Sequence, residues 1–84
     1  MDKLLTVSEA VALRTRQLMV KHGLTQYALE KKSTVTHGCL CGILQNTNKT
    51  VTLSTIMLLA QAFGLSVQEF LSPDIFDYEK IEIN

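Results

Sequence analysis

The sequence predicts an all-α fold, a compact domain of five short helices with a short C-terminal extension. Three observations support this prediction. The chain has 84 residues, which is enough for one domain with one small core. Hydrophobic residues make up 46% of it, as expected for a packed interior. Within residues 24–45, two short segments of helical periodicity are separated by three or four residues. Helices joined so tightly must cross steeply, which is the helix-turn-helix arrangement.

The first helix is expected to begin after Thr6 and to stop at Gly23. Thr6 and Glu9 have the spacing of a capping box, and Gly23 can adopt the left-handed conformation that ends a helix. A period of 3.6 residues places one inward face on Val11, Thr15, Leu18 and His22. Leu13 and Val20 share a different face, so they either pack under the C-terminal segment or form a surface for a partner.

The second and third helices are expected on either side of a short turn. Thr25 and Thr36 are the predicted N-caps, and Val35 should fill the angle between the two helices. The inward residues are expected to be Ala28, Leu29, Leu40, Ile43 and Leu44. The outward side of the third helix should carry His37, Gly38, Cys41, Gly42 and Gln45.

A fourth helix is expected to begin at Thr52 or Ser54 and to end before Gly64. Its predicted inward face comprises Leu53, Ile56, Leu59, Ala60 and Phe63. Ser66 and Glu69 form a second capping box, which opens a short fifth helix that ends at residues 72–73. We therefore assign residues 1–72 to the helical domain and residues 73–84 to an acidic C-terminal tail.

The tail contains apolar residues that leave two alternatives open. Ile81 and Ile83 flank Glu82 in a strand-like alternation, and the tail also carries Ile75, Phe76 and Tyr78. A chain end of this kind either frays or docks, on its own domain or on a second subunit.

The formal net charge is zero, which counts against a nucleic-acid binder, because such proteins are usually basic. The charge is unevenly distributed, however: residues 73–84 carry a net −3 and residues 1–72 a net +3. No apolar run approaches the length of a membrane helix and no signal-peptide pattern is present, so a cytoplasmic protein is expected. Cys39 and Cys41 are two apart on a predicted helix and cannot form a disulfide with each other, which agrees with a reduced compartment.

The chain resembles the lambda-repressor/Cro-type helix-turn-helix family, the XRE-like group of bacterial and phage regulators, over about residues 7–71. The residues that carry the resemblance are 23–26 (GLTQ), Leu29, 35–36 (VT), Leu40, Ile43, 52–56 (TLSTI), Ala60, 62–66 (AFGLS) and 69–71 (EFL). The resemblance implies that the third helix enters the major groove of double-stranded DNA and that the protein is a homodimer on a palindromic operator.

Site residues follow from the same resemblance. Positions that face base edges in similar proteins are occupied by His37, Gly38, Cys41 and Gly42. Positions that contact the DNA backbone are occupied by Thr25, Gln26, Thr36, Asn46, Asn48, Lys49 and Thr50. Gln26 would also cap the second helix.

Three departures from the family pattern are notable. Thr34 stands where relatives usually have the turn glycine, and Asn46 replaces the glycine that usually follows the third helix. Met19 and Leu44 occupy the positions of an arginine–glutamate pair found in many relatives. Because an apolar contact avoids the desolvation cost of two charges, Met19 and Leu44 are predicted to touch.

The predicted function is a small sequence-specific DNA-binding transcriptional regulator, with repression as the expected role. The alternative is a protein-interaction module of the same fold, such as an antitoxin-like or anti-regulator subunit, which would bind its partner through Leu13, Val20, the fifth helix and the tail. In either case the acidic tail could shield the DNA-binding face.

Other kinds of site receive less support from the sequence. His37, Cys39 and Cys41 suggest a metal or thiol sensor, but His37 and Cys41 on one helix face leave a zinc site short of ligands. Nothing resembles a catalytic constellation. The sequence therefore predicts no enzyme, cofactor, metal or small-molecule substrate.

Overall fold

The computed structural model describes residues 4–45 and 51–82. Its elements are, in chain order, β1 (Leu5–Thr6), α1 (Val7–His22), α2 (Gln26–Ser33), α3 (His37–Leu44), α4 (Leu53–Ala62), α5 (Val67–Phe70), the 3₁₀ turn η1 (Asp74–Phe76) and β2 (Ile81–Glu82). The predicted architecture of five helices is confirmed, and the two short strands are an addition to it. In the described part of the chain, no helix is both long and apolar enough to cross a membrane.

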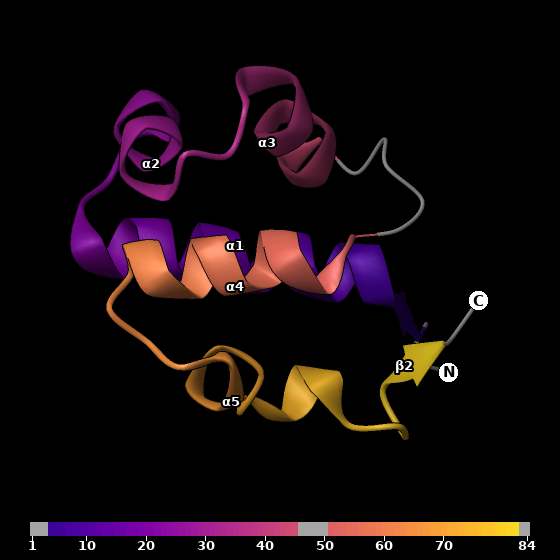
Figure 1. The fold of residues 1–84 in the computed structure, drawn as a ribbon. Coiled ribbons are helices and arrows are strands. Elements are labelled where there is room, and N and C mark those ends of the chain that lie inside the picture. Colours follow the sequence, from indigo (N-terminus) through magenta and orange to yellow (C-terminus); the bar gives the residue numbers. More distant parts are fainter. Residues whose placement is uncertain (1–3, 46–50, 83–84) are drawn as a thin grey trace.

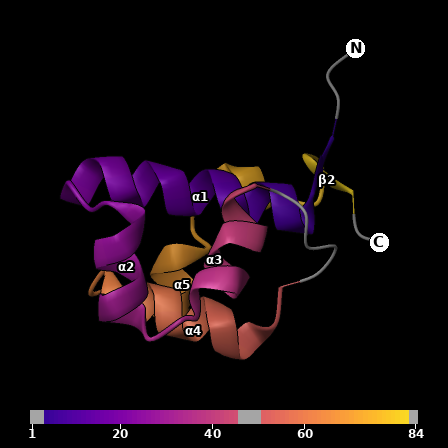
Figure 2. The same ribbon diagram turned by 90° about the horizontal axis from the view of Figure 1, so that it is seen from above.

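The helices form three layers. Figure 1 shows α1 and α4 at the same middle level, α2 and α3 above them, and α5 with the C-terminal segment below. Figure 2, seen from above, shows α1 and α4 on opposite edges of this level, here called the α1/α4 layer, with α2 and α3 running across from one to the other. The α2–α3 pair and the C-terminal segment therefore lie on opposite sides of the molecule.

Hydroxyl side chains cap all five helices. Each accepts a hydrogen bond from the backbone N–H three residues later, and the five are Thr6, Thr25, Thr36, Thr52 and Ser66. Both predicted capping boxes, Thr6 with Glu9 and Ser66 with Glu69, are present. Of the two candidates for α4, Thr52 is the cap. Gly23 ends α1 at φ +64°, as predicted.

The core lies where the helical periodicity placed it. It is formed by Val11, Leu18, Leu29, Val35, Leu40, Ile43, Leu44, Ile56, Leu59, Ala60, Phe63 and Phe70, together with smaller residues. The hydroxyl of Thr15 is fully buried and donates to the Val11 carbonyl at 2.8 Å, so its burial leaves no unsatisfied polar group.

Two predicted core residues are exposed. His22, at the end of α1, is exposed, although its ring centroid lies 5.4 Å from that of Phe63. Leu53, the first residue of α4, has a relative exposure of 62%. Both predictions were wrong because these positions lie at helix ends, where an inward stripe extends past the layer that covers it.

The C-terminal segment docks on its own domain. β2 pairs in parallel with β1, with Leu5 opposite Ile81 and Thr6 opposite Glu82. Ile81 is buried and the Leu5 N–H donates to the Lys80 carbonyl at 3.0 Å. Of the predicted alternatives, docking in cis is therefore correct over the described residues, and Ile83 lies outside them.

Leu13 and Val20 do not pack under that segment. Their relative exposures are 38% and 83%, so the first of the two alternatives for them is wrong. On α1, the neighbouring residue Arg14 does reach the lower layer. Its guanidinium donates to the carbonyls of Phe70 at 2.8 Å and Glu69 at 3.0 Å, which satisfies carbonyls at the C-terminal end of α5.

Candidate nucleic-acid interface

A left-handed residue between α2 and α3 sets the angle of the pair. Thr34 has φ +61°, the only positive φ of a non-glycine residue in the described chain, and its N–H donates to the Glu30 carbonyl at 3.0 Å. Val35 is then buried in the angle, as predicted, with its N–H on the Ser33 hydroxyl at 3.2 Å. This turn directs α3 across α2 and away from an antiparallel hairpin.

The inward face of α3 is fixed to the core. Leu40, Ile43 and Leu44 are buried as predicted. The guanidinium of Arg16 on α1 donates to the Leu44 carbonyl at the end of α3. Met19 is partly buried and packs against the core that contains Leu44, and its direct contact with the Leu44 side chain stays a prediction.

The outward face of α3 differs from the predicted one at a single position. His37 and Gly38 are exposed and Cys41 is half-buried. A β-carbon built on Gly38 would meet no heavy atom within 4 Å, so open space lies beside it. Gly42 is buried, so its predicted outward placement is wrong. A helical wheel predicts only the direction in which a residue faces. Gly42 has no side chain that could extend past the surrounding side chains to solvent, so it is buried even on the outward side.

A hydrogen-bonded cluster joins the two helices on this face. The Glu30 carboxylate on α2 lies 2.7 Å from Nδ1 of His37 and 3.2 Å from the Gln26 amide nitrogen. The same amide lies 2.9 Å from Sγ of Cys41, and Sγ lies 3.3 Å from Nε2 of His37. Gln26, Glu30, His37 and Cys41, here called the interhelix cluster, thus form a closed ring of contacts.

The sequence prediction named three members of this cluster and missed Glu30. The available signal was spacing: Gln26 and Glu30 are four apart on α2, as His37 and Cys41 are on α3, so each pair shares a helix face. Gln26 was also predicted to cap α2, but the cap is the Thr25 hydroxyl, which accepts from the Ala28 N–H at 3.1 Å.

The charges near the α2–α3 surface are few. In the described chain α3 contains no Lys, Arg, Asp or Glu. Lys31 and Lys32 are exposed in the last turn of α2, and the Lys31 ammonium lies 4.8 Å from the centroid of the Tyr27 ring. Glu30 places one carboxylate beside α3. The predicted backbone contacts Asn46, Asn48, Lys49 and Thr50 lie outside the described residues.

The interhelix cluster does not have the geometry of a metal site. Glu30 and Cys41 contact opposite nitrogens of the His37 ring, so the three side chains do not converge on one point. Across the described residues, no group of three or more His, Cys, Asp or Glu side chains is placed to hold a metal ion.

Comparison with known proteins identifies the family. The sequence pattern of a family described as a Cro/C1-type HTH DNA-binding domain matches residues 14–75, which extend from α1 into η1. No curated protein and no solved structure matches the chain. The matched segment covers most of the chain and contains the α2–α3 pair, which agrees with the resemblance found in the sequence. The chain therefore belongs to the Cro/C1-type helix-turn-helix DNA-binding domain family.

Proposed function

We propose that this protein is a small sequence-specific repressor that places α3 in the major groove of double-stranded DNA. The observation that carries the proposal is the division of α3 into two faces. Leu40, Ile43 and Leu44 fix one face to the core, whereas His37 and Gly38 leave the other accessible at the start of the helix. A recognition helix contacts base edges from its N-terminal part.

The residues of that face would divide between recognition and close approach. His37 is the side chain with the strongest hydrogen-bonding capacity, and Cys41 is partly accessible beside it. Gly38 has no side chain and open space around it, so the helix backbone can approach the bases closely. Gly42 is buried and leaves the proposed set. Thr25, Gln26 and Thr36, at the starts of α2 and α3, together with residues 46–50, would contact phosphates.

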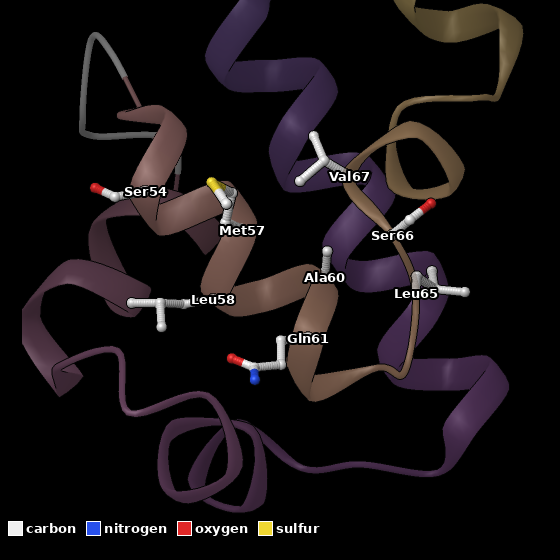
Figure 3. Close-up of a pocket in the computed structure, with 8 residues that line it drawn as sticks. All are labelled: Ser54, Met57, Leu58, Ala60, Gln61, Leu65, Ser66 and Val67. Atoms are coloured by element: carbon white, nitrogen blue, oxygen red, sulfur yellow. The ribbon is translucent and has the colours of Figure 1, made fainter.

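Homodimerisation would use an apolar groove on α4 and the segment that follows it. The groove has a volume of about 540 Å³ and is lined by Ser54, Met57, Leu58, Ala60, Gln61, Leu65, Ser66 and Val67. Figure 3 shows these side chains, contributed by α4 and by the segment leading into α5. None of them is charged, so two copies can meet here around a two-fold axis without like-charge repulsion.

The same groove supports a second candidate function, a protein-interaction module that binds a different partner. Met57 is 52% exposed and Leu58 36%, which is the kind of exposed apolar surface that partners cover. The carboxylate of Glu30 beside α3 also disfavours approach to phosphates. In this case DNA binding would be weak or absent.

DNA affinity measured by fluorescence anisotropy separates the two functions. Binding sites are first selected from a random duplex library at low salt, and the affinity is then followed as salt is raised. A repressor should select a palindrome with half-sites about one helical turn apart and lose affinity steeply with salt. Failure to bind any duplex at low salt would favour the interaction module.

A charge inserted on α3 tests which helix enters the groove. Gly38→Glu adds a carboxylate where the structure has open space, so the fold should persist while DNA affinity falls by about 10-fold or more, because a carboxylate facing base edges and phosphates is repelled. The matched control is Gln68→Glu, which adds the same charge at an exposed position of α5 and should leave affinity nearly unchanged. Equal affinities of the two variants would show that α3 does not enter the groove.

The dimer surface is tested separately. Met57→Glu places a charge in the groove and should convert a dimer to monomers in sedimentation velocity, because an unpaired buried charge is costly. Val20→Glu, on an exposed part of α1, is the control. If Val20→Glu dissociates the dimer and Met57→Glu does not, α1 is the interface instead.

A further inference from the structure

The interhelix cluster has the arrangement of an activated thiol. Sγ of Cys41 lies 3.3 Å from Nε2 of His37, and Nδ1 of the same ring lies 2.7 Å from the Glu30 carboxylate. These contacts occur in the order of nucleophile, proton acceptor and orienting carboxylate. The Gln26 amide nitrogen lies 2.9 Å from the sulfur on another side.

The hydrogen positions follow from the contacts. A carboxylate oxygen accepts hydrogen bonds, so the contact with Glu30 is satisfied by the tautomer of His37 in which Nδ1 donates, and that tautomer leaves the Nε2 lone pair facing the thiol. Gln26 has two amide hydrogens, and its nitrogen lies within reach of both Sγ of Cys41 and the Glu30 carboxylate at 3.2 Å. Each of the four contacts can thus join a donor to an acceptor, and this arrangement places Nε2 where it can accept the thiol proton.

Accessibility also favours chemistry at this thiol. The His37 side chain is 74% exposed, whereas that of Glu30 is only 15% exposed. The orienting carboxylate is therefore largely shielded from water, whereas the imidazole faces solvent and Cys41 is partly accessible beside it. Cys39, two residues earlier, packs against the hydrophobic core. The two cysteines therefore provide an internal comparison between an activated thiol and a structural one.

We propose that Cys41 is a covalent modification site for small-molecule disulfides. The thiol proton passes to Nε2 of His37, and Sγ attacks one sulfur of the disulfide. A new bond joins Sγ to that sulfur as the original sulfur–sulfur bond breaks, and the departing thiolate takes the proton from His37. Cys41 is oxidised to a mixed disulfide, one sulfur of the reagent is reduced to a free thiol, and no other oxidant is required.

The modification would also control DNA binding, a consequence that rests on the proposed function. An adduct on Sγ would occupy the outward face of α3 and would replace the contact between Cys41 and Gln26 that joins α3 to α2. Both changes oppose entry of α3 into the major groove. Because thiols reverse the exchange, a reductant should restore binding.

The experiment measures the reaction of the folded chain with dithiodipyridine, a neutral disulfide that releases an absorbing thione. Cys39→Ala leaves Cys41 as the sole thiol and should react rapidly, whereas Cys41→Ala should react slowly through the core-packed Cys39. Adding His37→Ala to Cys39→Ala should slow the reaction by about 10-fold, since the proton acceptor is lost. Adding Glu30→Gln should slow it less, because only the orientation of the ring is disturbed. Adding His22→Ala, the other histidine, should leave the rate unchanged.

The outcomes are distinct. A rate that does not respond to His37→Ala, or equal rates for the two cysteines, would overturn the proposal. If Cys39→Ala does not fold, tandem mass spectrometry of the wild-type chain after limiting reagent replaces it, with the adduct expected on Cys41 and an adduct on Cys39 contradicting the proposal. The wild-type adduct should also lose DNA affinity and regain it with reductant. If the unmodified chain binds no DNA, the proposed function fails and the thiol result stands independently.

Discussion

Replacing Thr34 by glycine should stabilise the fold. Thr34 has φ +61° at the end of α2 and is exposed, so its branched side chain makes little core contact while its backbone is left-handed. That conformation costs an L-residue about 1–2 kcal/mol, and a β-branched residue adopts it especially rarely. Glycine adopts it without this cost.

Two opposing terms reduce the gain. Glycine loses about 0.5–1 kcal/mol more conformational entropy on folding than alanine does. The Thr34 hydroxyl also donates to the Ser33 carbonyl at 2.5 Å, a partly buried contact worth about 0.5 kcal/mol. Thr34→Gly should therefore stabilise the protein by about 0.5 kcal/mol, which raises Tm by about 2–4 °C in a domain of this size.

Thermal and urea unfolding followed by circular dichroism measure this effect, with two controls. Thr34→Ala removes the hydroxyl but keeps the β-carbon, so it should not stabilise. Gly23→Ala introduces a β-carbon into the same left-handed region at φ +64°, where no heavy atom lies within 4 Å. It should cost about 1 kcal/mol through conformation alone. A lower Tm for Thr34→Gly, or equal Tm values for Thr34→Gly and Thr34→Ala, would refute the reasoning.

Four further predictions concern recognition and the C-terminal segment. His37→Ala should relax DNA sequence preference at one position of each half-site by about 1–3 kcal/mol, measured by competition with single-substituted operators; unchanged preference would remove His37 from the base contacts. Lys49→Ala should weaken binding to all sequences alike and reduce the slope of log affinity against log salt by about 1; a sequence-dependent loss would contradict a phosphate contact. Ile81→Ala should cost about 2 kcal/mol in urea unfolding because Ile81 is buried and its strand contacts α1; no loss would mean that the segment is frayed. The side-chain hydrogen bond and charge of Lys80 hold the pKa of the Asp74 carboxyl below its usual value, and Asp74 likewise raises the pKa of the Lys80 ammonium. The pair therefore stabilises the fold from about pH 4 to about pH 10, and this contribution is lost as pH falls through the lowered pKa of Asp74. Asp74→Asn should slightly flatten the acid limb of the curve of stability against pH, and the exposure of the pair keeps the effect small.

Local patterns made most of the fold predictable. A hydroxyl N-cap and the residue three positions later are neighbours along the chain, so the capping boxes at Thr6 and Ser66 could be identified from spacing alone. The apolar periodicity likewise identified Leu40, Ile43 and Leu44 as the buried face of α3. A capping box has both partners within one helical turn, and the buried face of a helix is identified by the spacing of its own residues, whatever they pack against.

Contacts between distant segments were not predictable in the same way. The pairing of Leu5 with Ile81 joins residues at opposite ends of the chain, and each strand has only two residues, too few for a periodic signal. Arg14 contacts carbonyls of α5 more than fifty positions away. The candidate site combines both cases: the outward position of His37 follows from helical spacing, but its partner Glu30 depends on the angle at which α2 and α3 cross.

The arrangement of the layers also changes the meaning of the net charge. The acidic tail was expected to be able to shield the DNA-binding face, but Figure 1 shows the C-terminal segment on the far side of the α1/α4 layer from α2 and α3. β2 is paired to β1 there, and the Asp74 carboxylate is occupied by Lys80 at 2.8 Å. The acidic C-terminal segment therefore lies on the opposite side of the molecule from Lys31 and Lys32, which are exposed on α2. Because this segment is held away from α2 and α3, its carboxylates would not compete with phosphates for the proposed DNA-binding face, so the zero net charge of the chain is a weaker argument against DNA binding than the sum suggests.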